Sequence, residues 1–265
     1  MGNLGIAFLL TLIAGLSTGI GSALAFLAKR DNSRFLALSL GFSAGVMIYV
    51  SMVEIFQKAT DTLTGELGES GGNWATVGGF FGGILLIAII DKLVPENENP
   101  HEFHHHPQAE EQKQRSKLLR MGSFTALIIA IHNFPEGLAT FISALQEPKI
   151  AIPIVAAIAI HNIPEGIAVS VPIYQASGSK RKAFTWSFAS GLAEPLGAVV
   201  GYLVLLPVMN DVVYGMVFAG VAGIMVFISL DELLPAAREY GEHHLEIYGL
   251  IAGMVVMAVS LLLFL

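Results

Sequence analysis

The chain has 265 residues, of which 54% are hydrophobic and only 13% are charged. The charged share is about half of the roughly 25% found in soluble domains, which excludes an ordinary soluble protein and indicates an integral membrane protein with the lipid bilayer as its partner. A formal net charge of −7 argues against nucleic acid as a partner, and the absence of cysteine excludes disulfides and thiolate metal ligands.

Apolar runs close to the ~20 residues that a spanning helix needs recur along the whole chain. The predicted spans are residues 4–28, 35–56, 74–90, 121–145, 150–174, 183–206, 212–230 and 247–265. We therefore expect an all-α, polytopic membrane protein with eight transmembrane helices. All of them belong to a single membrane domain that covers residues 1–265.

The basic residues are distributed unevenly between the predicted links. Of the 14 Lys and Arg residues, 12 fall in the links that follow the first, third, fifth and seventh spans. The positive-inside rule makes these links cytoplasmic. We therefore expect a multi-pass protein of the cell (inner) membrane, with both termini on the extracytoplasmic side.

One polar motif is written twice, in the fourth and fifth predicted spans. The run His132-Asn133-Phe134-Pro135-Glu136-Gly137 returns 29 residues later as His161-Asn162-Ile163-Pro164-Glu165-Gly166. In each copy the His and the Glu are four residues apart, so they share one face of a helix. Each proline frees a backbone carbonyl one turn earlier, and each asparagine adds an amide oxygen.

The short link at residues 146–149 makes the two motif helices an antiparallel hairpin, which brings both motifs to the middle of the bilayer. Imidazoles and carboxylates are costly there unless they have partners. A buried ion pair that only fixes helix packing could explain one copy, but two copies, each with a proline, favour a metal site. Imidazole and oxygen ligands suit Zn²⁺ or Fe²⁺, which we expect as a transported substrate and not as a prosthetic group.

A further carboxylate lies near the middle of the sixth predicted span, where Glu194 precedes a proline. It could complete a two-metal cluster bridged by Glu136 and Glu165. The alternative is a Glu194 side chain that pairs with a neighbouring hydroxyl or histidine.

Four more residues are candidate ligands with plain alternatives. Three of them lie at the inner ends of the third and seventh spans: Asp91, Asp231 and Glu232. They are either ordinary interfacial charges or part of an exit path for a cation. Met47 could be a thioether ligand, although a methionine in a membrane helix usually fills space in the core.

The link between the third and fourth spans, residues 95–120, is polar and carries His101, His104, His105 and His106. We expect a cytoplasmic loop that is disordered over residues 95–117. It is either a solvated linker that binds metal incidentally or a segment that collects metal at the inner mouth.

Several glycines recur at the small-xxx-small spacing that lets membrane helices approach closely. The pairs are Gly15/Gly19, Gly41/Gly45, Gly78/Gly82, Gly79/Gly83 and Gly197/Gly201. They indicate either general close packing or a sliding surface between moving bundles.

The paired motifs, the span count and the His-bearing link resemble the ZIP family of divalent metal-ion transporters, most closely its bacterial ZupT-like branch. Other stretches similar to the family are residues 41–47, 91–95 and 231–235. The resemblance implies uptake of Zn²⁺, often with Fe²⁺, Mn²⁺, Co²⁺ or Cd²⁺. It also implies a homodimer and an inverted 3+2+3 arrangement, in which spans one, four, five and six move against the others as an elevator.

The resemblance further implies a binuclear metal centre. Its first site would comprise His132, Glu136, His161, Glu165 and Met47. Its second would comprise Asp91, Asn133, Glu136, Asn162, Glu165 and Glu194. Glu232 and Asp231 would form a further position facing the cytoplasm. Some relatives carry Gln-Asp where this chain has His161-Asn162, so the second site here has one negative charge fewer.

An enzyme is the rival interpretation, because a two-metal centre with an open position could activate water inside the membrane. The H-E-x-x-H order of zinc proteases is absent, however, and so is a G-x-S-x-G nucleophile motif. The sequence therefore favours a transporter over an intramembrane metallohydrolase.

Overall fold

The computed structural model describes residues 2–27, 32–93, 107–146, 148–200, 202–203, 210–240 and 244–264. Within these ranges the chain is almost entirely helical and contains no strand, which confirms the all-α prediction. The elements are α1 (Gly2–Ala25), α2 (Ser33–Val50), the π-helical turn η1 (Ser51–Ile55), α3 (Phe56–Leu93), α4 (Pro107–Gln146), α5 (Pro148–Ser177), α6 (Lys180–Gly191), α7 (Ala193–Val200), α8 (Asp211–Ile228), the π-helical turn η3 (Ser229–Leu233), α9 (Leu234–Tyr240) and α10 (Leu245–Phe264).

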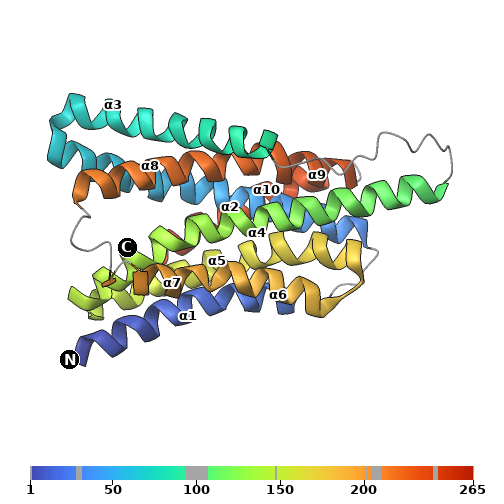
Figure 1. The fold of residues 1–265 in the computed structure, drawn as a ribbon, viewed down its shortest axis with the longest axis horizontal. Helices are drawn as coiled ribbons and strands as arrows, with labels where there is room; N and C mark the ends of the chain where they lie inside the picture. Colours follow the sequence, from blue (N-terminus) through green and yellow to red (C-terminus); the bar gives the residue numbers. More distant parts are fainter. Residues whose placement is uncertain are drawn as a thin grey trace.

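The long helices lie side by side, and the two chain ends lie at the same end of the molecule (Figure 1). Within the described residues, four helical stretches are long and apolar enough to cross a membrane: Asn3–Ala25, Ser33–Ile90, Asp211–Arg238 and Leu245–Leu263. The protein is therefore a multi-pass membrane protein. Eight spans in an inverted 3+2+3 arrangement stay a prediction.

The helices pack into two groups. The motif bundle consists of α1, α4, α5, α6 and α7, with α1 against α5 and α4 against both α5 and α7. The support bundle consists of α2, α3, α8, α9 and α10, with the turns η1 and η3. In it α3 packs against α8, and α2 against α10. The bundles meet mainly where α2 contacts α5 and where α4 contacts α8 (Figure 1).

Glycine packing joins helices within each bundle. A Cβ added at Gly45 of α2 would meet the backbone of Leu250 in α10, and one at Gly197 of α7 would meet Phe134 in α4. The other predicted glycines with close neighbours likewise touch a helix of their own bundle: Gly15, Gly41, Gly79 and Gly83. These contacts favour general close packing, and the interpretation as a sliding surface between bundles is wrong for these glycines.

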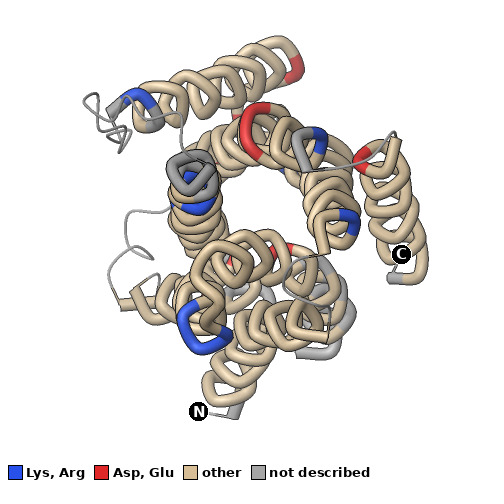
Figure 2. Tube along the Cα trace, turned by 90° about the vertical axis from the view of Figure 1, so that its right-hand side faces the viewer, with Lys and Arg blue, Asp and Glu red and all other residues tan. Residues whose placement is uncertain are grey.

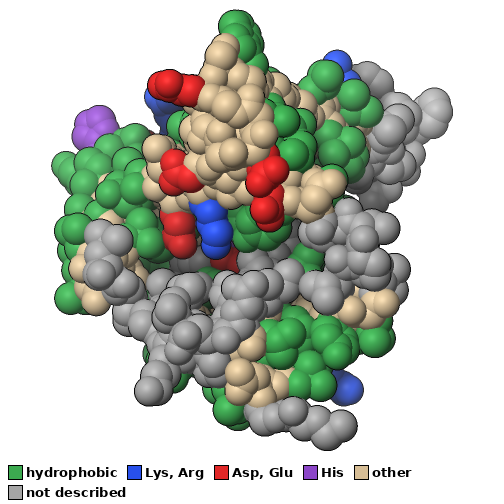
Figure 3. All heavy atoms as spheres, turned by 90° about the vertical axis from the view of Figure 1, so that its left-hand side faces the viewer, with side chains coloured by type: hydrophobic (Ala, Val, Ile, Leu, Met, Phe, Trp, Pro, Cys, Tyr) green, Lys and Arg blue, Asp and Glu red, His purple; other side chains and the backbone are tan. Residues whose placement is uncertain are grey.

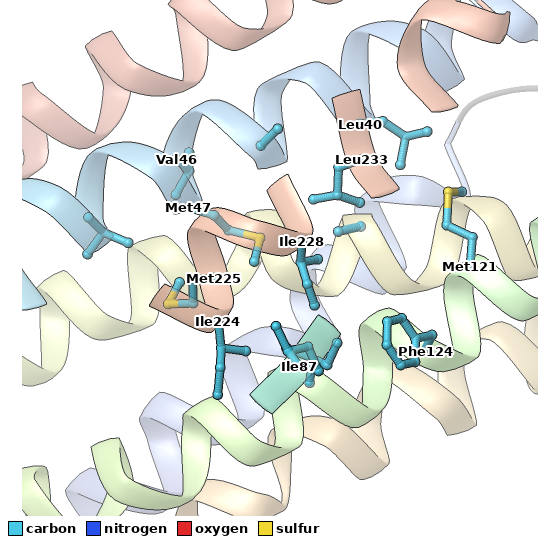
Figure 4. Packing of buried hydrophobic residues seen from close by; sticks show 14 of the residues in the cluster. Leu40, Val46, Met47, Ile87, Met121, Phe124, Ile224, Met225, Ile228 and Leu233 are labelled. Carbon is cyan, nitrogen blue, oxygen red and sulfur yellow. The ribbon is translucent and has the colours of Figure 1, made fainter. Parts of the chain in front are cut away.

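The boundary between the bundles is largely apolar. One buried cluster combines Met47, Met225 and Ile228 of the support bundle with Met121 and Phe124 of α4 (Figure 4). Methionine side chains are flexible and adapt to changes in their neighbours' positions. The cluster therefore holds the bundles together through non-directional contacts.

The expected disorder of residues 95–117 is wrong for residues 107–117, because α4 begins at Pro107. Proline is favoured at the first position of a helix, and the Ala, Glu, Gln, Lys and Arg residues that follow have high helix propensity. The four histidines of the predicted loop lie outside the described residues.

Two other predicted spans differ from the helices of the structure, one in where it ends and one in its continuity. The second continues through η1 into α3 as far as Gly68, whose φ of 75° lies in the left-handed region and turns the chain back. The sixth is broken at Leu192, between α6 and α7. Pro195 explains the break, since it has no N–H to donate to the carbonyl of Gly191.

Candidate metal centre

Both motifs lie inside continuous helices, the first in α4 and the second in α5. The Nε2 atom of His132 lies 3.6 Å from Oε2 of Glu136 and 3.6 Å from Oε1 of Glu165. His132 and Glu165 are buried, with 3% and 1% of their side chains exposed. The hairpin thus brings one imidazole and two carboxylates from two helices together, as the spacing predicted.

These separations suit a shared cation. They exceed the ~2.7–3.2 Å of an N–H···O hydrogen bond. They are close to the ~3.3 Å that separates two ligands on a tetrahedral zinc with bonds of about 2.0 Å. A divalent ion could therefore bind between these groups after small side-chain movements.

The asparagine of each motif is oriented by a neighbouring helix. Asn162 Nδ2 donates to the carbonyl of Ala14 in α1 at 3.1 Å, and Asn133 Nδ2 donates to the carbonyl of Ser190 in α6 at 3.4 Å. The Oδ1 atoms of both amides are buried and have no hydrogen-bond partner among the described residues. Buried oxygens without a donor are costly unless a cation or water satisfies them.

Glu194 joins the two motifs from α7. Its side chain is fully buried, and its Oε2 accepts a hydrogen bond from Asn162 Nδ2 at 2.9 Å. The partner is thus an amide of the second motif, and not the hydroxyl or histidine of the alternative reading. Oε1 has no hydrogen-bond partner in the described part of the chain. Three carboxylates in an apolar interior call for positive charge.

A cavity of ≈ 20 Å³ opens beside this cluster. His132 and Glu136 of α4 line one wall, and Ile55 of η1 with Phe218 and Val221 of α8 line the other. The volume is enough for about one water molecule. A cation that enters must therefore lose most of its hydration shell. Because its walls come from both bundles, the cavity lies at their boundary.

The remaining predicted ligands lie on other helices, or their side chains fall outside the described residues. Met47 is 1% exposed and packs in the apolar cluster of Figure 4. Asp231 is exposed and Glu232 is half-buried, both on η3. The side chains of His161 and Asp91 lie outside the described residues. Among the side chains that are described, no three His, Asp or Glu already enclose a metal-sized point.

Two features of the site could not be predicted from the sequence. The first is the pair of backbone carbonyls that orient the two amides, those of Ala14 and Ser190, because a backbone acceptor cannot be recognised from the residue type. The second is the cavity wall, because Ile55, Phe218 and Val221 look like any other apolar residues in a membrane helix.

Charge differs between the two ends of the molecule. At the end that holds the termini, exposed acidic residues gather over the tip of α3 and the start of α8 (Figure 3). They are Asp61, Glu66, Glu69 and Asp211. At the opposite end, several Lys and Arg residues lie at helix ends (Figure 2). Which end faces the cytoplasm stays a prediction.

The structure is that of a helical membrane protein in which a buried cluster of one histidine and two glutamates lies beside a cavity at the boundary between two helix bundles. A family described as ZIP Zinc transporter matches residues 91–261. The chain is 68% identical over 258 residues to a zinc transporter ZupT of Streptococcus mutans, with 97% of each chain covered. It is 63% identical over 261 residues to one of Chlorobaculum parvum, with 98% of this chain and 97% of the relative covered. The protein belongs to the ZIP family.

Proposed function

We propose that this protein imports divalent metal ions, chiefly Zn²⁺, across the cell membrane. The observation that carries the proposal is the approach of His132 to Glu136 and Glu165, at 3.6 Å each, beside a cavity between the two bundles. Relatives that cover nearly the whole chain are named zinc transporters, which supports this function over the rival hydrolase.

The site suggests a sequence of steps. Acidic side chains at the end with the termini raise the local concentration of cations. An ion enters the cavity, exchanges water for His132, Glu136 and Glu165, and neutralises carboxylates that lipid would otherwise make costly. His161 and Met47 are proposed as further ligands, as the resemblance implies.

A second ion position would use Asn133, Asn162 and Glu194, together with Asp91. The unsatisfied oxygens of the first three support it. The bundles then rearrange so that the site opens inward, and the ion leaves past Asp231 and Glu232.

Selectivity should be broad. The candidate ligands are imidazole nitrogens and carboxylate or amide oxygens with at most one thioether. This ligand chemistry favours Fe²⁺, Mn²⁺, Co²⁺ and Cd²⁺ as further substrates. The proposal also includes the homodimer, the eight spans in a 3+2+3 arrangement, and extracytoplasmic termini.

The decisive test is Zn²⁺ uptake into liposomes by purified Glu136→Gln protein. The exchange keeps the size of the side chain but removes its charge, so uptake should fall at least about tenfold. Glu246→Gln is the matched control, because Glu246 is also buried, at 7% exposed, but lies on α10. Equal uptake by Glu136→Gln and wild-type protein would refute the proposed centre.

A further inference from the structure

One buried hydrogen bond crosses the boundary between the bundles next to the metal centre. The hydroxyl of Ser43, on α2 of the support bundle, donates to the carbonyl of Pro164 at 2.8 Å. Pro164 belongs to the second motif and directly precedes Glu165. Ser43 is fully buried, so solvent does not compete for this bond.

The hydrogen bond of Ser43 to the other bundle contrasts with the bonds of other hydroxyls in the described helices. Thr11 and Thr76 donate to the carbonyl four residues earlier in their own helix. The Ser170 hydroxyl in α5 donates to that of Ser22 in α1, which belongs to the same bundle. The side chain of Gln175 in α5 does reach the carbonyl of Asn32 at the start of α2, but that bond is exposed. The Ser43 hydroxyl instead reaches, buried, from α2 of the support bundle to α5 of the motif bundle, and a buried apolar cluster spans the same boundary.

A serine is suited to a contact that must form and break. If Pro164 moves away, the Ser43 hydroxyl can turn back to the carbonyl of Ser39, four residues earlier in α2. No donor is then left without an acceptor, so breaking the bond costs only the net value of one buried hydrogen bond, about three- to tenfold in the equilibrium, and not the larger penalty of an unsatisfied donor. The apolar contacts around it are non-directional and do not themselves favour one relative position of the bundles.

We propose that Ser43 is a latch that favours the arrangement of the two bundles seen here. The hydroxyl holds the second motif against α2 while Glu165 faces His132, and it releases the motif when the bundles shift. The inference rests on the proposed function, because alternating access requires the site to change its exposure between the bundles.

Ser43→Ala removes the donor and should shift the balance between the two arrangements by about three- to tenfold. Thr76→Val is the matched control, since it deletes a buried hydroxyl of the support bundle whose bond stays within α3. Ser43→Thr keeps a donor and should restore the wild-type balance.

Distances between two spin labels, one on each bundle, can report the populations of the two arrangements. The natural chain has no cysteine, so cysteines placed at Leu9 of α1 and Leu262 of α10 take labels at single sites. These side chains are 56% and 70% exposed and belong to different bundles. In nanodiscs, Ser43→Ala should lower the odds of the distance that fits this structure by about three- to tenfold. Thr76→Val and Ser43→Thr should leave those odds unchanged.

The proposal is overturned if Ser43→Ala gives the wild-type distance distribution, or if Thr76→Val shifts it equally. A thermal melt of each variant shows whether it is folded. If Ser43→Ala is not folded, the isosteric pair Ser43→Val and Ser43→Thr decides, because the two side chains differ only in the donor, and equal distance distributions in this pair overturn the latch. Absence of Zn²⁺ uptake by wild-type protein would refute the proposed function separately, because the distance comparison does not depend on transport.

Discussion

Gly137 offers a test of how precisely the centre is built. It ends the first motif, where α4 passes directly over the backbone of Glu194 in α7. A Cβ added there would lie 2.5 Å from the carbonyl carbon and 2.8 Å from the Cα of Glu194. Because non-bonded carbons rest about 3.5–4.0 Å apart, Gly137→Ala must push α7 away by roughly 1 Å.

That displacement separates Glu194 from Asn162, whose hydrogen bond is 2.9 Å long. Overpacking of this kind costs about 1–3 kcal/mol. At ~1.4 kcal/mol per factor of ten, initial Zn²⁺ uptake into liposomes should therefore fall by about 5- to 150-fold. The loss should occur even though alanine is a better helix former than glycine.

Gly78→Ala is the control for this prediction. A Cβ at Gly78 has nothing within 4 Å, so the exchange tests helix propensity alone and should leave uptake unchanged. Wild-type uptake by folded Gly137→Ala protein would refute the reasoning, since Glu194 would then tolerate displacement. Equal losses in both variants would show that the effect is not specific to the centre.

Two further predictions concern protons and charge. Acidification from about pH 7.5 to 5.5 should slow uptake several-fold at fixed free Zn²⁺, because protons compete with the metal for the imidazole and carboxylate ligands; a rate that rises on acidification would contradict this. Asn162→Asp should lower Zn²⁺ uptake more than Asn162→Ala does, because a carboxylate cannot donate to Ala14 or Glu194 and would repel Glu194 at close range; the opposite order in a liposome assay would count against it.

The sequence was sufficient to predict the contact between the two motifs. The four-residue spacing of His132 and Glu136 places both on one face of α4, and the short link to α5 brings Glu165 opposite them. Glu194 could be suspected because a carboxylate beside a proline in a membrane span needs a partner. These features depend on local periodicity and on the cost of burying charge, which sequence reasoning captures.

The rest depends on which helices meet, and that is set by packing over long sequence distances. The amide of Asn162 donates to the backbone carbonyl of Ala14, which is 148 residues away in the sequence. Every residue has such a carbonyl, so the residue type does not predict this contact. The polarity of residues 107–117 predicts disorder, but these residues also have high helix propensity, and α4 begins at Pro107. Gly68 ends a helix through its backbone angle and not through hydrophobicity.

The neutral side chain of Asn162 affects both the net charge of the proposed centre and the way Glu194 is held in it. Glu136, Glu165 and Glu194 place three carboxylates close together in an apolar interior, and one divalent cation balances two of them. The amide of Asn162 donates to Glu194 at 2.9 Å and to α1 at 3.1 Å, so the third carboxylate is held by a neutral donor. An aspartate at this position would replace that donor with another negative charge, and a second cation would then have to hold Glu194. In the proposed centre, this hydrogen bond would favour a single tightly held ion, with the second position occupied more weakly.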